Sequence, residues 1–275
     1  MGNYSTRELQ QRTLQILLTV DRVCRDHGLT YYISDGTMLG AVRHGGFIPW
    51  DDDMDICMPR PDFERLLAHA PEWLPAPFEQ VCVERDPYCA CNFMKIIDGS
   101  TTLIERWSFN QLGGVYMDVF PIDGVSSVKW RRKLRFRLYR TVDRWIYMRN
   151  RDPYKRGRGY TSWIPRLLQA TTTNAGLHRL LRRIQTAHPY ESSALVADFD
   201  SGERSVTRKE VFGTPTPVNF EGHELLGVEH PHEYLSHLYG DYMQLPPENK
   251  RRIHNFDYVD LEHSYHDYHD TRQFK

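Results

Sequence analysis

Hydrophobic and polar positions repeat with two different periods along this chain of 275 residues. Between Leu9 and Cys24, apolar residues recur with the spacing of an amphipathic helix, and Ser5 with Glu8 forms a capping box in front of it. Gly28 is placed to end that helix. Short segments rich in β-branched and aromatic residues then predict strands, at "LTYYIS", "DMDICM", "FEQVCVE", "NFMKII", "TTLIE" and "VYMDVF".

The order of these elements predicts the fold class. Short helical patterns at "DGTMLGAVR" and "DFERLLAHA" lie between the first strands, and Pro61 opens the second of them. Alternating strands and helices over residues 1–125 indicate an α/β (α+β) core, a mixed β-sheet flanked by helices. Residues 126–275 are mostly helical in pattern, so we expect a basic helical region and a C-terminal segment that complete the substrate site.

A basic segment changes this picture locally. Residues 129–158 hold 13 Lys and Arg but only two Asp, a local net charge of +11 in a chain whose total is −1. Within it, four large apolar residues share one helical face: Trp130, Leu134, Leu138 and Trp145. This face either contacts an anionic membrane surface peripherally or packs into the core, with a solvated basic back. The sequence leaves both interpretations open.

The composition excludes several classes of protein. Hydrophobic residues make up 40% and aromatic residues 12%, which argues against disorder. A net charge of −1 gives no reason to expect a nucleic-acid partner. No apolar run has the length of a membrane span, and the N-terminal segment lacks the apolar core of a secretory signal. We therefore expect a cytoplasmic protein, with contact at the inner membrane face as the open alternative.

The cysteines allow two interpretations. Three of the five, Cys82, Cys89 and Cys91, lie close enough in sequence to be zinc ligands, but no paired C-x-x-C spacing supports a zinc site. Reduced, buried thiols are the other interpretation.

Acidic residues enter a segment that otherwise resembles a buried strand, "GGFIPWDDDMDICM" at residues 45–58. In a strand, Asp53 and Asp55 project from the same face about 6.6 Å apart, while Met54 and Ile56 enter the core. Two ionised carboxylates that close together repel one another and resist desolvation. A divalent cation removes the conflict because it takes oxygen ligands and cancels charge. Asp52, on the opposite phase, is expected to be structural.

A third carboxylate, Asp118, lies in the strand-like "VYMDVF". If that strand pairs beside "DMDIC", Asp118 comes within about 5 Å of it laterally. The three carboxylates then form a site for one or two Mg²⁺ (or Mn²⁺) ions, and Asp51 either supports a second ion or only caps the turn. Gly36 and Thr37 stand between a strand and a helix, where backbone N–H groups and a hydroxyl can face a phosphate.

The segment "SDGTMLGAVRHGGFIPWDDDMDICMPRPDFERL" resembles the LicD family of the nucleotidyltransferase superfamily, and so do "YMDVFPIDG" and "YLSHLYGDYMQLPPENKRRIH". The resemblance implies a nucleotidyltransferase-like fold. It also implies transfer of phosphocholine from CDP-choline to sugars of cell-surface glycans such as teichoic acid or lipopolysaccharide. The related fukutin-like proteins use CDP-linked polyol donors, so a related CDP-alcohol is a second possible donor.

By this resemblance Asp53, Asp55 and Asp118 are catalytic and bind the metal that bridges the donor diphosphate, with Asp118 preferred as the base. Lys95 meets a phosphate or instead extends to the surface. The residues expected to bind the donor or its phosphates are Gly36, Thr37, Arg43, Trp50 and Lys95.

Aromatic faces recognise a quaternary ammonium group, and candidates near the matching segments are Trp50, Tyr116, Tyr239 and Tyr242. Basic residues late in the chain either contact donor phosphate or an acidic acceptor or are only solvated: Lys250, Arg251 and His254.

Two other functions remain open at this point. A nucleotidyltransferase would move NMP from an NTP to a small molecule with the same carboxylates, and would release pyrophosphate instead of CMP. A non-catalytic glycan- or nucleotide-binding module is the third class, although three intact candidate metal ligands argue against it. Neither the acceptor sugar nor the transferred alcohol is fixed by the sequence.

Overall fold

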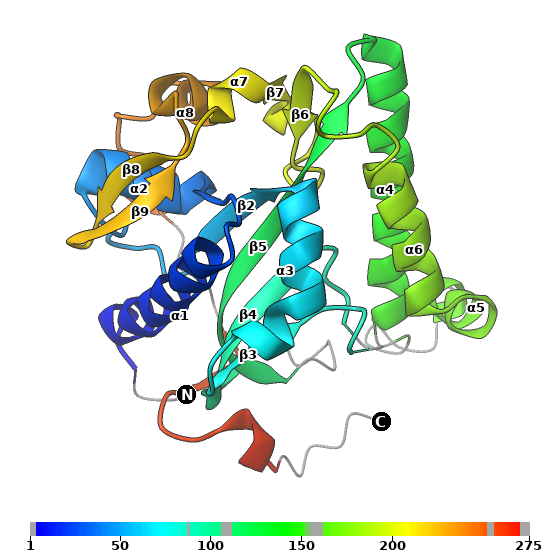
Figure 1. Cartoon of the computed structure of the whole chain (residues 1–275). Helices are drawn as coiled ribbons and strands as arrows, with labels where there is room; N and C mark the ends of the chain where they lie inside the picture. The colour runs from blue at the N-terminus through cyan, green and yellow to red at the C-terminus, as the bar shows by residue number, and fades with distance from the viewer. Residues whose placement is uncertain are drawn as a thin grey trace.

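A large mixed sheet forms the centre of the molecule (Figure 1). The computed structural model describes residues 4–86, 89–105, 112–151, 153, 162–251 and 256–269. Its strands are β1 (Tyr32–Ile33), β2 (Asp55–Pro59), β3 (Phe78–Val81), β4 (Met94–Ile104), β5 (Gly113–Val125), β6 (Leu195–Ala197), β7 (Thr207–Arg208), β8 (Thr216–Phe220), β9 (His223–Gly227) and β10 (Tyr258–Asp260).

Neighbouring strands follow the order β1-β2-β5-β4-β10, with β3 also paired to β4 and β6 joining β5 to β7. The β2–β5 pair is parallel, and the other pairs in this sheet are antiparallel. β8 and β9 form a separate hairpin. The parallel pair joins two strands that are distant in the sequence, so it decides which of their side chains meet.

Some helices pack on the sheet, and others form a layer beside it. They are α1 (Thr6–Asp26), α2 (Asp35–His44), α3 (Arg60–Trp73), α4 (Lys129–Asn150), α5 (Trp163–Thr171), α6 (Asn174–Gln185), α7 (Lys209–Phe212) and α8 (Pro231–Tyr239). Short 3₁₀ turns are η2 (Gly202–Ser205), η3 (Glu248–Lys250) and η4 (Tyr265–Asp267). Within the residues that the structure describes, no helix is both long and apolar enough to cross a membrane.

α1 and α3 pack on one face of the sheet (Figure 1). The predicted capping box is present, with Ser5 accepting from the backbone N–H of Glu8, and Gly28 follows the helix with φ +60°. Along β5, Val115, Met117 and Val119 are fully buried, whereas the residues between them are only partly buried. Because side chains alternate across a strand, these in-between residues point to the opposite face.

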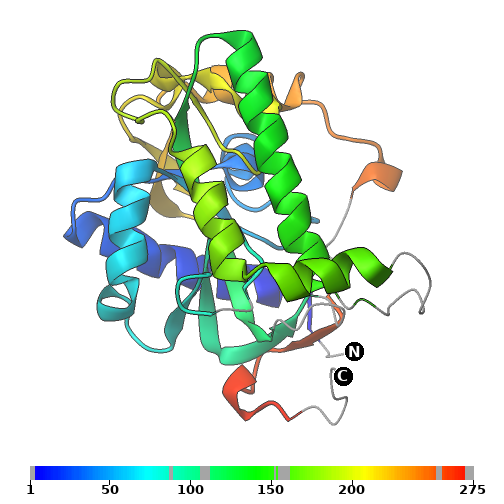
Figure 2. The same cartoon turned by 90° about the vertical axis from the view of Figure 1, so that its right-hand side faces the viewer.

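α4 and α6 form a second layer beside the sheet (Figure 2). A smaller core joins them to β6, and the rings of Phe136 and Phe199 stack there with centroids 4.6 Å apart. A buried ion pair anchors α3 to β5, since Arg60 donates to both carboxylate oxygens of Asp123 at 2.8 and 2.6 Å.

The predicted α/β class, a mixed sheet with flanking helices, is confirmed. Some boundaries differ from the prediction. β2 begins at Asp55, so Asp53 lies before the strand, and "NFMKII" with "TTLIE" forms the single strand β4. The C-terminal part adds strands as well as helices, and β6 and β10 pair with β5 and β4. A domain division after residue 125 stays a prediction.

One interpretation of the apolar stripe in the basic segment is wrong. Trp130, Leu134, Leu138 and Trp145 do not face the core, because each is more than two-fifths exposed. The buried face of α4 consists of other residues, among them Phe136, Tyr139 and Ile146. Asp152 and residues 154–158 of the segment lie outside the described residues.

Candidate active site

Asp55 and Asp118 face each other across the parallel strand pair β2–β5. They are direct register partners, and Asp118 is at the same time the partner of Lys95 on β4. Register partners on neighbouring strands project from the same face of a sheet. Two carboxylates and one ammonium group therefore stand in a row on the face opposite to α1 and α3, as the strand-pairing argument predicted for Asp118.

Lys95 is held tightly in this row. Its Nζ lies 3.2 Å from Oδ1 of Asp118, donates to Oε1 of Glu105 at 2.7 Å, and stands 3.3 Å from the ring centroid of Tyr116. Burial lowers the pKa of Lys95, but the surrounding acidic groups, Asp118 first, outweigh it and raise that pKa well above its usual value. Lys95 is therefore a buried cation and does not extend to the surface.

The buried positions of the carboxylates raise their pKa values. Burial is the main cause that raises the pKa of Asp55 well above its usual value, and four neighbouring carboxylates add to it: Asp53, Asp118, Asp35 and Asp51. Burial also raises the pKa of Asp118 to about 6, although Lys95 opposes this. Five acidic residues thus interact electrostatically in one small region.

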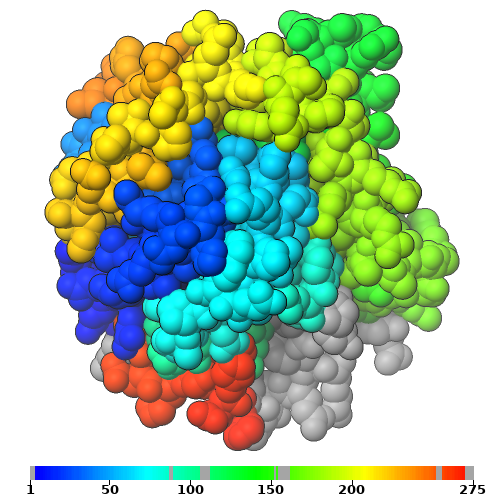
Figure 3. Space-filling view, viewed as in Figure 1, coloured from blue at the N-terminus to red at the C-terminus, as the bar shows by residue number. Residues whose placement is uncertain are grey.

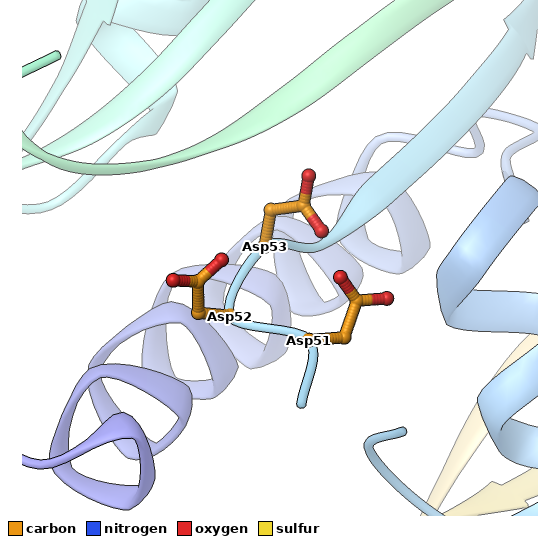
Figure 4. Close-up of side chains that lie close together, drawn as sticks. All are labelled: Asp51, Asp52 and Asp53. Carbon is orange, nitrogen blue, oxygen red and sulfur yellow. The ribbon is translucent and has the colours of Figure 1, made fainter. Parts of the chain in front are cut away.

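Asp51, Asp52 and Asp53 occupy consecutive positions of the segment that leads into β2 (Figure 4). Each offers a ligand oxygen within 4.8 Å of the others. The prediction that Asp53 and Asp55 lie side by side on one strand is wrong, because β2 starts only at Asp55. Asp53 nevertheless contributes to the raised pKa values of both Asp55 and Asp118, which places its charge near theirs. Asp52 is the most enclosed of the three, at 3% exposure.

The start of α2 lies against these carboxylates. Thr37 accepts a hydrogen bond through Oγ1 from the backbone N–H of Asp55 at 2.8 Å. A side chain at Gly36 would place its Cβ 2.8 Å from Oδ2 of Asp51, so a glycine here leaves space for that carboxylate. Both predicted residues therefore contact the acidic segment directly, and Thr37 holds the first residue of β2.

Asp35 is a site residue that the sequence reasoning missed. It has φ +43°, a left-handed conformation that few residues other than glycine, asparagine and aspartate adopt, and its backbone N–H donates to the hydroxyl of Tyr234. Burial raises the pKa of Asp35 to about 7; Asp198 and Asp53 raise it further and Arg204 opposes them.

Asp198 was missed as well. It follows directly after β6, and burial raises its pKa. The sequence does contain a signal for both residues. Asp35 follows the strand-like segment "YIS" and Asp198 follows "LVA", and an acid next to such a segment is the signal that identified Asp118.

Two predicted donor-binding residues lie at the edge of this site. Trp50 has the guanidinium of Arg251 4.6 Å from its ring centroid, and it meets His44 edge to face. Arg43 donates through Nη1 to the backbone oxygen of Tyr242 at 2.8 Å. The late residue Arg251 therefore contacts Trp50. His254, which was predicted together with Arg251, lies outside the described residues.

Of the tyrosines proposed for a cation cage, Tyr239 and Tyr116 both interact electrostatically with site residues. Burial raises the pKa of Tyr239, and Asp35 and Asp55 raise it further. The ring of Tyr116 is covered by Lys95, and the hydroxyl of Tyr242 lies 3.2 Å from Nδ1 of His232.

A cavity of about 330 Å³ opens beside Lys95. β4 and β5 form one wall, and α4 contributes Asp143 and Tyr147 to another. Charged and aromatic side chains mix around it, among them Phe93, Glu105 and Tyr116. Of the three charged residues in the row, the cavity is lined by Lys95.

The sequence left open whether Cys82, Cys89 and Cys91 form a zinc site. Cys82 and Cys89 are buried, and Cys91 interacts with Cys89. Among the described residues, no group of three ligand atoms within 4.8 Å of one another includes a cysteine.

The carboxylates fit a divalent cation. Beyond its ion pair with Lys95, Oδ1 of Asp118 is buried without a hydrogen-bond partner. Buried polar atoms are normally satisfied, and converging carboxylates with raised pKa values are stabilised by a cation with oxygen ligands. Asp55 and Asp118 could supply such ligands as register partners, and among the described residues the carboxylates within 4.8 Å of one another are Asp51, Asp52 and Asp53.

Comparison with known proteins identifies sequence relatives of this chain. Residues 28–148 match the LicD/FKTN/FKRP nucleotidyltransferase domain. The lipopolysaccharide cholinephosphotransferase LicD of Haemophilus influenzae is 26% identical over 271 residues, covering 93% of this chain and 97% of that protein.

Two eukaryotic relatives match shorter parts. Human FKRP, a ribitol 5-phosphate transferase, is 52% identical over 29 residues, 10% of this chain and 6% of its own length. Mannosyltransferase regulator 4 of Saccharomyces cerevisiae is 25% identical over 128 residues, 44% of this chain and 10% of its own length. The predicted resemblance is confirmed: residues 28–148 of this chain match the LicD/FKTN/FKRP nucleotidyltransferase domain, and most of the chain is similar to LicD.

Proposed function

We propose that this protein is a phosphotransferase that moves phosphocholine, or a related alcohol phosphate, from a CDP-linked donor to a sugar hydroxyl of a cell-surface glycan. The observation that carries the proposal is the register of Asp55, Asp118 and Lys95 across three strands. Two relatives are named for the transfer of an alcohol phosphate, cholinephosphate in one and ribitol 5-phosphate in the other. This supports the reaction class and leaves the alcohol to experiment.

Mg²⁺ or Mn²⁺ is the cofactor in this proposal, held by Asp53, Asp55 and Asp118, with Asp51 as an additional ligand. When bound, the ion supplies charge neutralisation for the donor diphosphate. The carboxylates fix the position of the reacting groups because two of them are anchored on paired strands. Thr37 holds Asp55 by a hydrogen bond, and Gly36 leaves space for the carboxylate of Asp51.

Asp118 is the proposed base. A carboxylate that is held in place by an ion pair with Lys95 can accept the proton of an attacking sugar hydroxyl. Lys95 holds Asp118 by an ion pair and also lines the neighbouring cavity. A phosphate that enters this cavity meets the ammonium group of Lys95, and Arg43 and Trp50 are further donor-binding residues in this proposal.

The test is an assay of nucleotide products. The protein is incubated with CDP-choline, CDP-ribitol, other CDP-alcohols and NTPs, with and without Mg²⁺, in the presence of a glycan acceptor. We expect CMP to be released from a CDP-alcohol only when a divalent cation is present. Turnover of an NTP to pyrophosphate with no turnover of any CDP-alcohol would identify a nucleotidyltransferase and overturn the proposal. Binding of CDP-alcohols without turnover under all conditions would identify a non-catalytic module.

A further inference from the structure

The exposed face of α4 carries a stripe of large apolar side chains. Trp130, Leu134, Leu138 and Trp145 are 64, 49, 49 and 43% exposed. Their spacing of four, four and seven residues keeps them on one side of the helix. Four large exposed apolar side chains on one side of a helix differ from the isolated exposed apolar residues that are common on soluble proteins.

A ridge of basic residues runs along the same helix beside the stripe. Lys133, Arg137, Arg140 and Arg144 are exposed and follow one another at three- and four-residue spacing. α4 as a whole holds nine Lys and Arg and one acid, Asp143, which accepts a hydrogen bond from Asn92 and lines the cavity. The outer surface of the helix therefore combines apolar side chains with positive charge.

The opposite side of α4 is firmly packed. Arg135 donates to the backbone oxygens of Gly124, Ile184 and Gln185, and Phe136 and Tyr139 pack on Phe199. The helix is thus anchored to the body of the protein while its apolar stripe remains outside. Figure 2 shows α4 along the outer side of the molecule, and its first turns protrude at the upper right in Figure 3.

We propose that this face of α4 docks the protein on the surface of an anionic lipid bilayer. Tryptophan and leucine side chains insert at the boundary between headgroups and acyl chains, and neighbouring Lys and Arg attract acidic headgroups. A second copy of the chain fits this face poorly, because a symmetric contact through α4 would bring the basic ridges of both copies together. α5, which packs against α4, adds exposed Trp163, Ile164 and Leu167 to the same helical layer.

The docking face is independent of the proposed reaction, but it has a bearing on the acceptor. α4 lines the cavity beside Lys95 with Asp143 and Tyr147, so the helix that contacts the bilayer also forms a wall of the path to the site. A glycan carried on a lipid at that surface is the kind of acceptor that this arrangement would serve.

The experiment measures flotation of the full chain with vesicles of phosphatidylcholine alone and with vesicles in which phosphatidylglycerol replaces part of it. We expect binding to the anionic vesicles that weakens with salt and is far weaker to the neutral ones. Leu134→Glu/Leu138→Glu should lower partitioning at least tenfold. Each of Lys133→Gln, Arg137→Gln and Arg140→Gln should lower partitioning onto the anionic vesicles about fivefold, because each basic residue contributes about 1 kcal/mol to the binding free energy.

Leu245→Glu is the matched control, because Leu245 is equally exposed at 48% but lies outside α4. Thermal melts verify that all variants fold. The proposal fails if wild-type protein does not bind anionic vesicles at low salt, or if the α4 variants bind as well as Leu245→Glu. It also fails if sedimentation velocity reveals a dimer that Leu134→Glu/Leu138→Glu dissociates.

Discussion

At the scale of single residues, this protein keeps acidic groups where they are costly. Burial and mutual repulsion raise the pKa of Asp35, Asp55 and Asp118, so each would be more stable if it were neutral. Such an arrangement weakens the protein without ligands and is compensated when a cation binds. These proposed site residues therefore contribute unfavourably to the stability of the ligand-free protein.

The first prediction concerns the acid before β2. Asp53→Asn should abolish CMP release while the protein stays folded, because a neutral amide of the same shape removes one metal ligand charge and little packing. Asp26→Asn, an exposed change at the end of α1, is the control and should retain full activity. Undiminished turnover in Asp53→Asn would mean that the metal ligands are assigned incorrectly.

The second prediction concerns pH. A carboxyl whose pKa is higher in the folded state contributes stability that is present below its unfolded pKa and is lost as pH rises through the folded value. For Asp35 this window runs from about 4 in the unfolded chain to about 7 in the folded protein. The metal-free protein should therefore lose stability across that window.

Asp35→Asn should reduce this loss, since asparagine tolerates the left-handed backbone at this position but cannot ionise. The measurement is the melting temperature in a chelator at the two ends of the window, where a change of 1 kcal/mol corresponds to about 2–4 °C. Equal pH dependence in wild type and Asp35→Asn would contradict the assignment of Asp35 to the acidic cluster.

At the scale of elements, the connection between α3 and β5 keeps the sheet and its helical cover in register. Arg60 and Asp123 form a buried bidentate pair there. Removing one partner of such a pair leaves an uncompensated charge in the interior. The sequence reasoning did not find this pair, because an Arg and an Asp that are distant in the chain give no local pattern.

We expect Asp123→Ala to lower the free energy of unfolding by about 3–5 kcal/mol, measured by denaturant unfolding. Asp62→Ala on α3, the helix of Arg60, is the control, because the partner of Asp62, Arg65, is half exposed and such pairs contribute about 1 kcal/mol or less. If both variants lose the same stability, the buried pair does not anchor α3.

Strand patterns identified most elements of the sheet but not their pairing or all of their ends. The apolar context of Asp118 indicated its strand, and the guess that this strand pairs with β2 is confirmed. The start of β2 at Asp55 depends on Thr37 and Ser34, which hydrogen-bond to its backbone from another element. The exposure of the α4 stripe depends on which face meets α6, and spacing alone cannot decide this.

At the scale of the whole molecule, a bound cation should act as a structural ligand. Mg²⁺ or Mn²⁺ should raise the melting temperature as its concentration increases. At a free-ion concentration one hundred times the dissociation constant, the free energy of unfolding should rise by about 2.7 kcal/mol. Asp118→Asn should remove most of this concentration dependence, whereas Asp26→Asn should keep it. A similar rise in wild type and Asp118→Asn would show that the cation binds elsewhere.

The parallel pairing of β2 with β5 also has a consequence for folding. Asp55 and Asp118 are far apart in the sequence and come together only when a long loop of chain has closed. Contacts between residues that are far apart in the sequence form slowly, because the intervening chain must first lose conformational entropy. A cation that needs both carboxylates should therefore slow unfolding much more than it speeds folding, and during synthesis the protein becomes able to bind it only after β5 has emerged and paired.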